Sequence, residues 1–182
     1  MPPDGKPEDG TWKLDAFAGD GVRIVYEDAA RCIGVCENVI FTIEDAEPPL
    51  EYLDELRRIV LNLGEKSGKT LALLFLISSR CKPPSDAVRA QIERDRQALE
   101  PFVKAGAHVV FGEGFRAAAK RSVLSLLFAT SRHSFPVKVF AEVDPALAWL
   151  VKSLGDAAPR PAITNELAPA VAGLCRARFT TT

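Results

Sequence analysis

Residues 63–77 read LGEKSGKTLALLFLI, and this stretch decides between two kinds of α/β fold. It is close to the phosphate-binding pattern G-x-x-x-x-G-K-[ST], but only three residues separate Gly64 from Gly68 where the pattern has four. A phosphate-binding loop also needs a strand before it and a helix after it, so that the positive end of the helix dipole faces the phosphate. Here the order is reversed, because residues 48–63 carry apolar side chains at helical spacing and residues 70–77 form an apolar run typical of a buried strand. We therefore interpret Gly64 as the C-cap of a helix followed by a solvated turn, and not as part of a nucleotide site.

The segments on either side of this stretch predict the remaining elements. Before it, strands are predicted at residues 22–27, 31–35 and 39–43, with Gly34 marking a bulge or a close approach. After it, helices at 86–104, 115–129 and 144–154 alternate with strands at 108–111 and 137–140. Three short strands in succession predict an antiparallel start to the sheet. The expected fold is α/β, a mixed β-sheet with antiparallel N-terminal strands and about four helices packed on it.

The composition of the two ends predicts the domain boundaries. Residues 1–21 are rich in Pro, Gly and Asp and predict a flexible N-terminal tail. Residues 22–154 hold all the elements above and predict one domain. The stretch GDAAPRPA begins at Gly155 and reads as a linker, so residues 155–182 are predicted to be a linker and a C-terminal helical extension.

Charge and cysteine content exclude several classes of function. The 182 residues carry a net charge of −1, which provides no basic field for nucleic acid. No run reaches the roughly 18 apolar residues of a membrane span, so stable membrane insertion is not expected. The acidic, Pro/Gly-rich N-terminus is unlike a signal peptide, and this predicts a cytoplasmic location. The four cysteines and two histidines match no zinc spacing, so we expect no metal and no cofactor.

Two longer segments resemble a known family. VKVFAEVDPALAWLVKSL at 137–154 looks like the last strand, Asp-capped turn and final Trp-Leu helix of the SpoIIAA-like, or STAS-like, small α/β proteins of bacteria. VFGEGFRAAAKRSVLSLL at 110–127 looks like a strand-to-helix passage of the same family. The resemblance covers about residues 22–154, and it implies a mixed sheet covered by helices without intrinsic catalysis.

STAS-like proteins that antagonise anti-sigma factors carry a phosphorylatable Ser or Thr where a strand meets a helix N-terminus. The matching place here is LISSRCKPPSDAV, so the resemblance implies Ser78, Ser79 and Ser85 as candidate phosphorylation sites. No Asp precedes Ser78 or Ser79, which departs from the Asp-Ser pair typical of the family. The alternative interpretation is that Ser78 and Ser79 end a strand and that Ser85 caps a helix.

The predicted helix 115–129 is a candidate contact surface. Basic residues gather in its first half and a broad apolar run fills its second half, wider than the single stripe that covers a sheet. The candidate surface for a partner or ligand comprises Phe115, Arg116, Lys120, Leu124, Leu127 and Phe128. Its occupant would be another protein, a second copy of the chain or an apolar small molecule. The alternative is that the preceding helix and the C-terminal segment cover it.

Cys81 is the one candidate for a reactive group. It lies between Arg80 and Lys82, and neighbouring cations favour the thiolate, although no base accompanies it.

Three hypotheses follow from the sequence. The first is a non-enzymatic STAS-like protein that acts through protein–protein contacts, with regulation as one such role. The alternatives are a small apolar-ligand or lipid-binding module and a thiol-dependent enzyme that uses Cys81.

Overall fold

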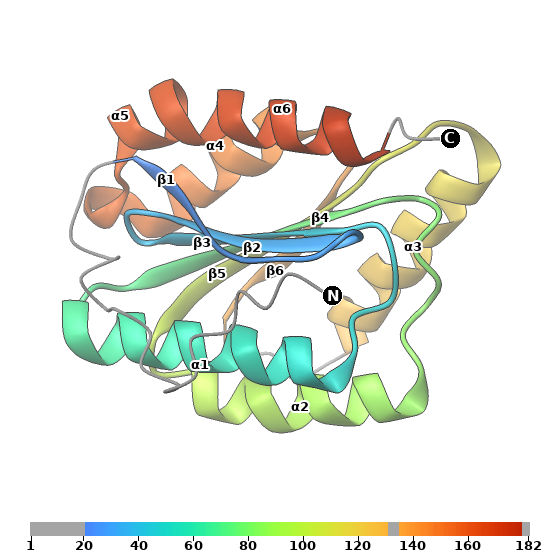
Figure 1. Ribbon diagram of the computed structural model, residues 1–182, viewed down its shortest axis with the longest axis horizontal. Helices are drawn as coiled ribbons and strands as arrows, with labels where there is room; N and C mark the ends of the chain where they lie inside the picture. Colours follow the sequence, from blue (N-terminus) through green and yellow to red (C-terminus); the bar gives the residue numbers. More distant parts are fainter. Residues whose placement is uncertain (1–20, 131–134, 180–182) are drawn as a thin grey trace, which may run out of the picture.

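The computed structural model describes residues 21–130 and 135–179, and its centre is a six-stranded mixed sheet (Figure 1). The strands are β1 (Val22–Glu27), β2 (Arg31–Cys36), β3 (Val39–Glu44), β4 (Leu71–Ile77), β5 (Val103–Val110) and β6 (Val137–Phe140). They lie in the sheet in sequence order. Strands β1, β2 and β3 pair antiparallel, and β3 to β6 pair parallel. The predicted mixed sheet with antiparallel N-terminal strands is confirmed.

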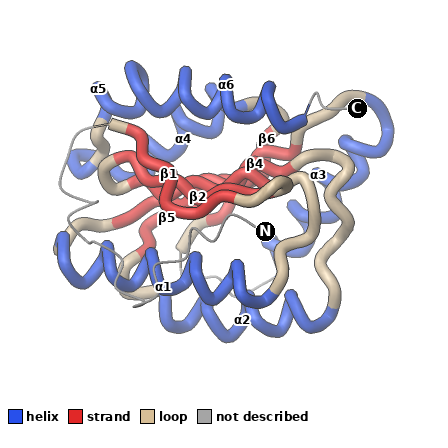
Figure 2. The backbone as a smooth tube through the Cα atoms, in the orientation of Figure 1, coloured by secondary structure: helices blue, strands red, loops and turns tan. Residues whose placement is uncertain are grey.

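Helices cover both faces of this sheet, as the tube in Figure 2 makes plain. They are α1 (Leu50–Ser67), α2 (Asp86–Leu99), α3 (Gly114–Thr130), α4 (Val143–Leu154), the short α5 (Arg160–Ala162) and α6 (Ala168–Phe179). Helices α1 and α2 lie on one face because successive right-handed crossovers that advance in one direction place their helices on the same side. Helices α4 and α6 lie on the other face. Helix α3 starts beyond the end of β5 (Figure 1), and its Phe128 packs on His108 and Phe75, on the same face of the sheet as α1 and α2.

Two apolar cores follow from this layering, one on each face of the sheet. Neighbouring residues of β3 alternate between them, so that Ile40 packs towards α1 and α2 while Phe41 packs towards α4 and α6. Burial on both faces explains why the central strands read as continuous apolar runs. No helix among the described residues is long and apolar enough to cross a membrane.

The C-terminal segment packs on the sheet as far as Phe179, and it contains α6, a helix in the region where a helical extension was expected. A π-helical turn, η3 (Ile163–Leu167), and α6 pack against the sheet beside α4. Leu167 and Val171 are fully buried in the core shared with β3, β4 and β5. The Pro-rich stretch after Gly155 therefore turns the chain back onto the sheet and does not lead away from it.

The end of α1 also differs from the sequence-based expectation. The helix continues through Gly64 to Ser67, and its C-cap is Gly68 with a left-handed φ of 61°. Gly64 lies inside the helix, and Phe102 packs so closely there that a Cβ would be 2.4 Å from its Cδ1, which requires glycine at this position. The reversed order, with a helix before this stretch and β4 after it, is confirmed, so the adjoining end of α1 is its negative C-terminal end.

Candidate functional site

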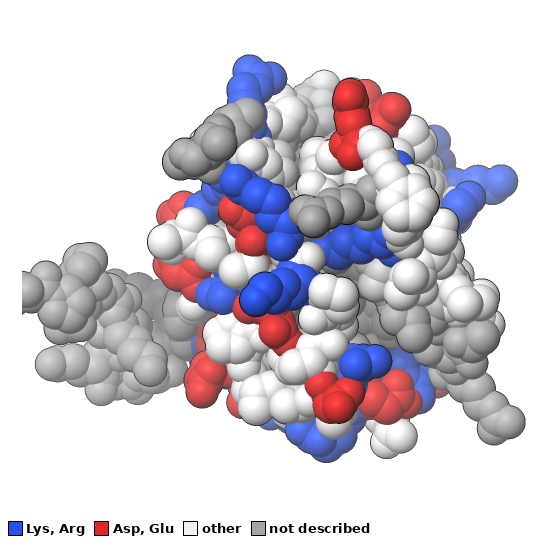
Figure 3. Space-filling view, turned by 90° about the vertical axis from the view of Figure 1, so that its right-hand side faces the viewer, with Lys and Arg blue, Asp and Glu red and all other residues white. Residues whose placement is uncertain are grey.

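Several hydrogen-bonded and paired polar residues lie where β3, β4 and β5 end, which is the right-hand edge of Figure 1. Open α/β sheets bind their ligands outside the carboxyl ends of the strands, so this edge is the candidate site. Figure 3 faces this side of the molecule and shows Lys and Arg side chains gathered across its middle, with Asp and Glu beside and below them. Three structural features make up the edge: a turn after β4, a buried carboxyl at the end of β3, and a polar junction between β1, β2 and α6.

The turn after β4 is held by a lysine from α3. Lys120 Nζ donates to the carbonyl oxygen of Ser78 at 3.0 Å and to that of Cys81 at 2.5 Å. The same Ser78 carbonyl accepts from Cys81 N at 3.2 Å, which closes the turn. Burial lowers the pKa of Lys120, while Cys81 and Glu44 oppose this shift. Lys120, expected on a contact surface, instead points inward and ties α3 to the end of β4.

The carboxyl of Glu44 is buried at the end of β3. Its Oε1 accepts a hydrogen bond from Thr42 Oγ1 at 3.0 Å. Burial raises the pKa of Glu44 to about 7, and Thr42, Arg31 and Lys120 lower it only in part. A carboxyl that titrates near neutral pH is a functional-site signal, though it also occurs in structural networks. This burial was not predicted from the sequence, because one acidic residue after an apolar strand is usually exposed.

Cys81 does not have the lowered pKa that its cationic neighbours in the sequence suggested. Its side chain is buried, and burial raises the pKa of the thiol to about 11. Lys120 lowers this pKa, but the nearby carboxylates of Glu44, Glu47 and Asp45 raise it. At neutral pH the thiol is therefore protonated, and a protonated thiol is a poor nucleophile.

The three candidate serines lie close to one another but in different surroundings. Ser78 is buried, with its Oγ accepting from Arg80 N at 3.1 Å, and Ser79 packs against the backbone of Gly112. Ser85 is exposed and is the N-cap of α2, where its side chain accepts from Val88 N. This matches the interpretation of Ser85 as a helix cap.

The surroundings of Ser85 also bear on its phosphorylation. Its backbone N–H donates to the carboxylate of Glu47 at 2.6 Å, and this bond holds the pKa of Glu47 below its usual range. A phosphate at Ser85 would therefore meet a carboxylate that already occupies the positive end of α2.

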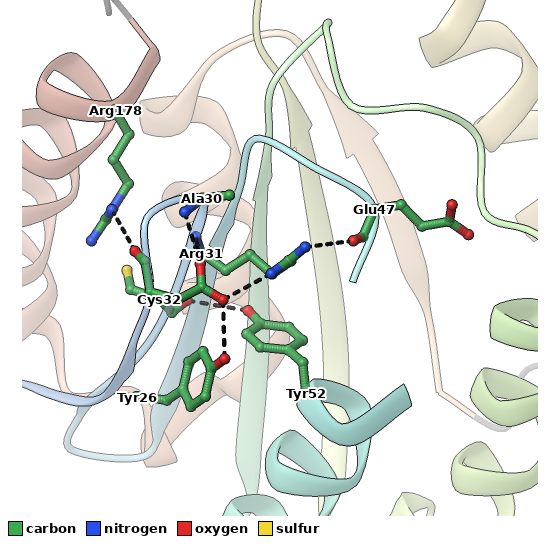
Figure 4. Close-up of polar contacts among 8 residues, drawn as sticks. Tyr26, Ala30, Arg31, Cys32, Glu47, Tyr52 and Arg178 are labelled. Carbon is green, nitrogen blue, oxygen red and sulfur yellow. Dashed lines mark hydrogen bonds and ion pairs between the residues drawn. The ribbon is translucent and has the colours of Figure 1, made fainter. Parts of the chain in front are cut away.

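A polar junction between β1 and β2 was not foreseen from the sequence (Figure 4). The carboxylate of Asp28 accepts from Tyr26 Oη, from the backbone N–H groups of residues 30 and 31, and from the Arg31 guanidinium at 2.8 Å. These bonds lower the pKa of Asp28 despite its partial burial. Arg178 from α6 donates to the Asp28 carbonyl at 3.3 Å and pairs with Glu27. The junction thus fastens the end of the chain to the first turn of the sheet.

An open hollow of about 430 Å³ adjoins this junction. It is lined by Glu27, Ala29, Asp45, Leu174, Ala177 and Arg178. Its charges are paired within the protein, because Arg178 binds Glu27 and Arg80 binds Asp45 at 2.7 Å. The hollow is therefore a polar recess of balanced charge, unlike an apolar ligand cavity.

Helix α3 presents a different apolar surface from the six residues selected from the sequence. Phe115 is 88% exposed, as expected of a contact residue. Phe128 instead packs on the ring of His108, with the ring centroids 4.5 Å apart, and Leu124 is half-buried. The side chains of Arg116 and Leu127 lie outside the described part of the structure. Val123 and Leu126, which belong to the same apolar run, are the exposed ones at 57% and 65%.

The space between α3 and the sheet contains stacked rings. His108 of β5 stacks on Phe75 of β4 with ring centroids 4.4 Å apart, and Phe128 of α3 covers its other side. These rings lie under α3, where a small apolar-ligand or lipid-binding module would need its pocket. Among the described residues, no group of three or more His, Cys, Asp or Glu side chains could hold a metal ion.

Comparisons of the chain with protein-family models, with curated proteins and with solved structures found no match.

Proposed function

We propose that this protein is a non-enzymatic, STAS-like protein that acts by binding another polypeptide through α3. The observation that carries the proposal is the exposure of Phe115, Val123 and Leu126. At 100° per residue these three side chains fall within an arc of about 80° on one side of the helix. Large apolar side chains grouped on one helix face are typical of protein contact surfaces.

The order of the elements supports the family part of the proposal. The resemblance implies a sheet that begins with antiparallel strands and continues through parallel strands joined by helices to the Trp149-containing α4, and residues 22–154 have this order. The four free cysteines support a cytoplasmic location, since thiols remain reduced there.

The two alternative functions have less support. A lipid or apolar-ligand module needs space under α3, and the rings of Phe75, His108 and Phe128 stack there. A thiol enzyme needs a thiolate, and the pKa of Cys81 is about 11.

The proposal is tested by affinity capture with the full chain and two variants from cells that express it. Val123→Glu places a charge on the exposed face of α3, while Ile92→Glu places the same charge at a 46% exposed position on α2. Proteins that bind the full chain and Ile92→Glu but not Val123→Glu would support the proposal. Equal capture by all three, or no capture by any, would refute it.

A further inference from the structure

The carboxyl of Glu44 is buried and has no ion-pair partner among the described residues. The residue is 7% exposed, and its side chain accepts a hydrogen bond from Thr42 Oγ1 at 3.0 Å. A carboxylate removed from water is costly unless a cation compensates its charge. This carboxyl must therefore either keep its proton or gain a cation when it ionises.

Ionisable groups from four neighbouring elements lie near this carboxyl. Arg31 of β2 and Lys120 of α3 lower its pKa. Tyr52 of α1 and Cys81 of the turn after β4 have their own pKa values raised by Glu44. The phenol and the thiol are neutral between pH 6 and pH 8, so of these four groups only the two cations can compensate a charge on Glu44.

The guanidinium of Arg31 is held by bonds to other acceptors. It donates to the Asp28 carboxylate at 2.8 Å and to the carbonyl of Glu47 at 2.9 Å. The neighbouring Asp45 is paired with Arg80 at 2.7 Å. Moving Arg31 towards the buried carboxyl would break both of its bonds and take the cation away from Asp28, so Arg31 is a fixed charge.

The ammonium of Lys120 is held only by neutral acceptors among the described residues. It donates to the carbonyls of Ser78 at 3.0 Å and Cys81 at 2.5 Å, at the end of a flexible four-carbon side chain. The turn that it holds adjoins Glu44, because Ser78 N donates to the Glu44 carbonyl at 2.9 Å. A carboxylate is a stronger acceptor for an ammonium than a peptide carbonyl is. Ionisation of Glu44 therefore changes which acceptor Lys120 prefers.

We infer that Lys120 is a proton-controlled latch on the turn after β4. While Glu44 is protonated, the ammonium holds the two carbonyls and fastens α3 to the turn. When Glu44 releases its proton to water, the ammonium moves to the carboxylate and the turn loosens. Because burial raises the pKa of Glu44 to about 7, the latch is closed below neutral pH and opens as the pH rises through about 7.

Two consequences separate this latch from the other chemistry of the molecule. The thiol of Cys81 stays protonated in both states, because ionised Glu44 also raises its pKa. The latch is independent of the proposed function, because it concerns how α3 is anchored and not what α3 binds.

A double-mutant cycle at two pH values tests the movement of Lys120 in the full chain. Urea denaturation gives the unfolding constants of the parent chain, Glu44→Gln, Lys120→Met and the double variant at pH 6 and pH 8. With a folded-state pKa of about 7, an ammonium that binds the carboxylate gives a coupling of about five- to ten-fold in the unfolding constant at pH 8 and less than two-fold at pH 6. A coupling below about five-fold at pH 8, or equal couplings at the two pH values, would overturn the inference.

Hydrogen exchange measures the loosening of the turn itself. The Cys81 N–H donates to the Ser78 carbonyl at 3.2 Å, and its protection factor should fall at least about five-fold more between pH 6 and pH 8 than that of the Ala30 N–H. Ala30 is the matched control, because its N–H donates at 2.7 Å to the carboxylate of Asp28, whose lowered pKa keeps it ionised throughout this range. The extra loss at Cys81 should be absent in Glu44→Gln. An equal loss at the two amides, or an extra loss that persists in Glu44→Gln, would show that Glu44 does not control the turn.

Discussion

The buried carboxyl of Glu44 should make the stability of this protein fall as the pH rises through neutrality. Burial raises the folded-state pKa to about 7 from an ordinary value of 4.5. The folded state therefore holds the proton more tightly than the unfolded state. The resulting stability is fully present below pH 4.5 and is lost as the pH rises through about 7. The difference between the two pKa values corresponds to about 3 kcal/mol.

Glu44→Gln removes this titration and keeps an oxygen that accepts from Thr42. At pH 5 the variant should be more stable than the parent chain by less than about 1 kcal/mol, because Glu44 is protonated in the folded parent and ionises only in the unfolded chain. At pH 8 the variant should be more stable by up to about 3 kcal/mol, because it buries no charge. Urea denaturation of both proteins at several pH values between 5 and 8 measures the difference directly.

Glu65→Gln, at an exposed position of α1, is the matched control and should show no comparable gain between pH 5 and pH 8. If Glu44→Gln has the same effect at both ends of this range, the carboxyl does not titrate there. If it destabilises the protein at pH 8, the ionised carboxyl is stabilised by its surroundings and the reasoning from burial is wrong.

Four further predictions concern packing and chemistry elsewhere in the fold. Gly64→Ala should lower the free energy of unfolding by about 1–3 kcal/mol because of its clash with Phe102, and Phe102→Leu should recover part of this loss in denaturant titrations. Lys120→Met should cost about 1–3 kcal/mol by removing two hydrogen bonds to the turn after β4, and hydrogen exchange should show that turn opening more readily. Cys81 should react with iodoacetamide at pH 7 roughly 100-fold more slowly in the folded protein than in urea, because its pKa is about 11 when folded and 9.0 when not; equal rates would contradict its burial. A chain that ends at Gly155 should lack a cooperative unfolding transition, because it exposes the core that α6 covers.

Local patterns along the chain determined most of the secondary structure. The apolar run of residues 71–77 specified a strand buried on both faces, and the apolar spacing before it specified α1. The short segments at the start specified antiparallel strands, and Gly34 marked a close approach, since a Cβ there would lie 2.1 Å from Cζ of Phe41. These features depend on neighbours a few residues away, so they can be recognised in the sequence alone.

Contacts between distant residues decided what the sequence could not show. In the sequence Gly64 is typical of a helix cap, but Phe102, 38 residues later, packs against it inside the helix. Glu44 is typical of an exposed acid, but the fold buries its carboxyl at the end of β3. Apolar and small residues of α3 occupy most positions around its circumference, so its sequence did not indicate which side would face the solvent. Lys120 points inward because its ammonium donates to two backbone carbonyl oxygens after β4, and Phe115 and Val123 are exposed on the same helix. Burial and side-chain direction are properties of the packed chain, because each depends on groups that the fold brings together from distant parts of the sequence.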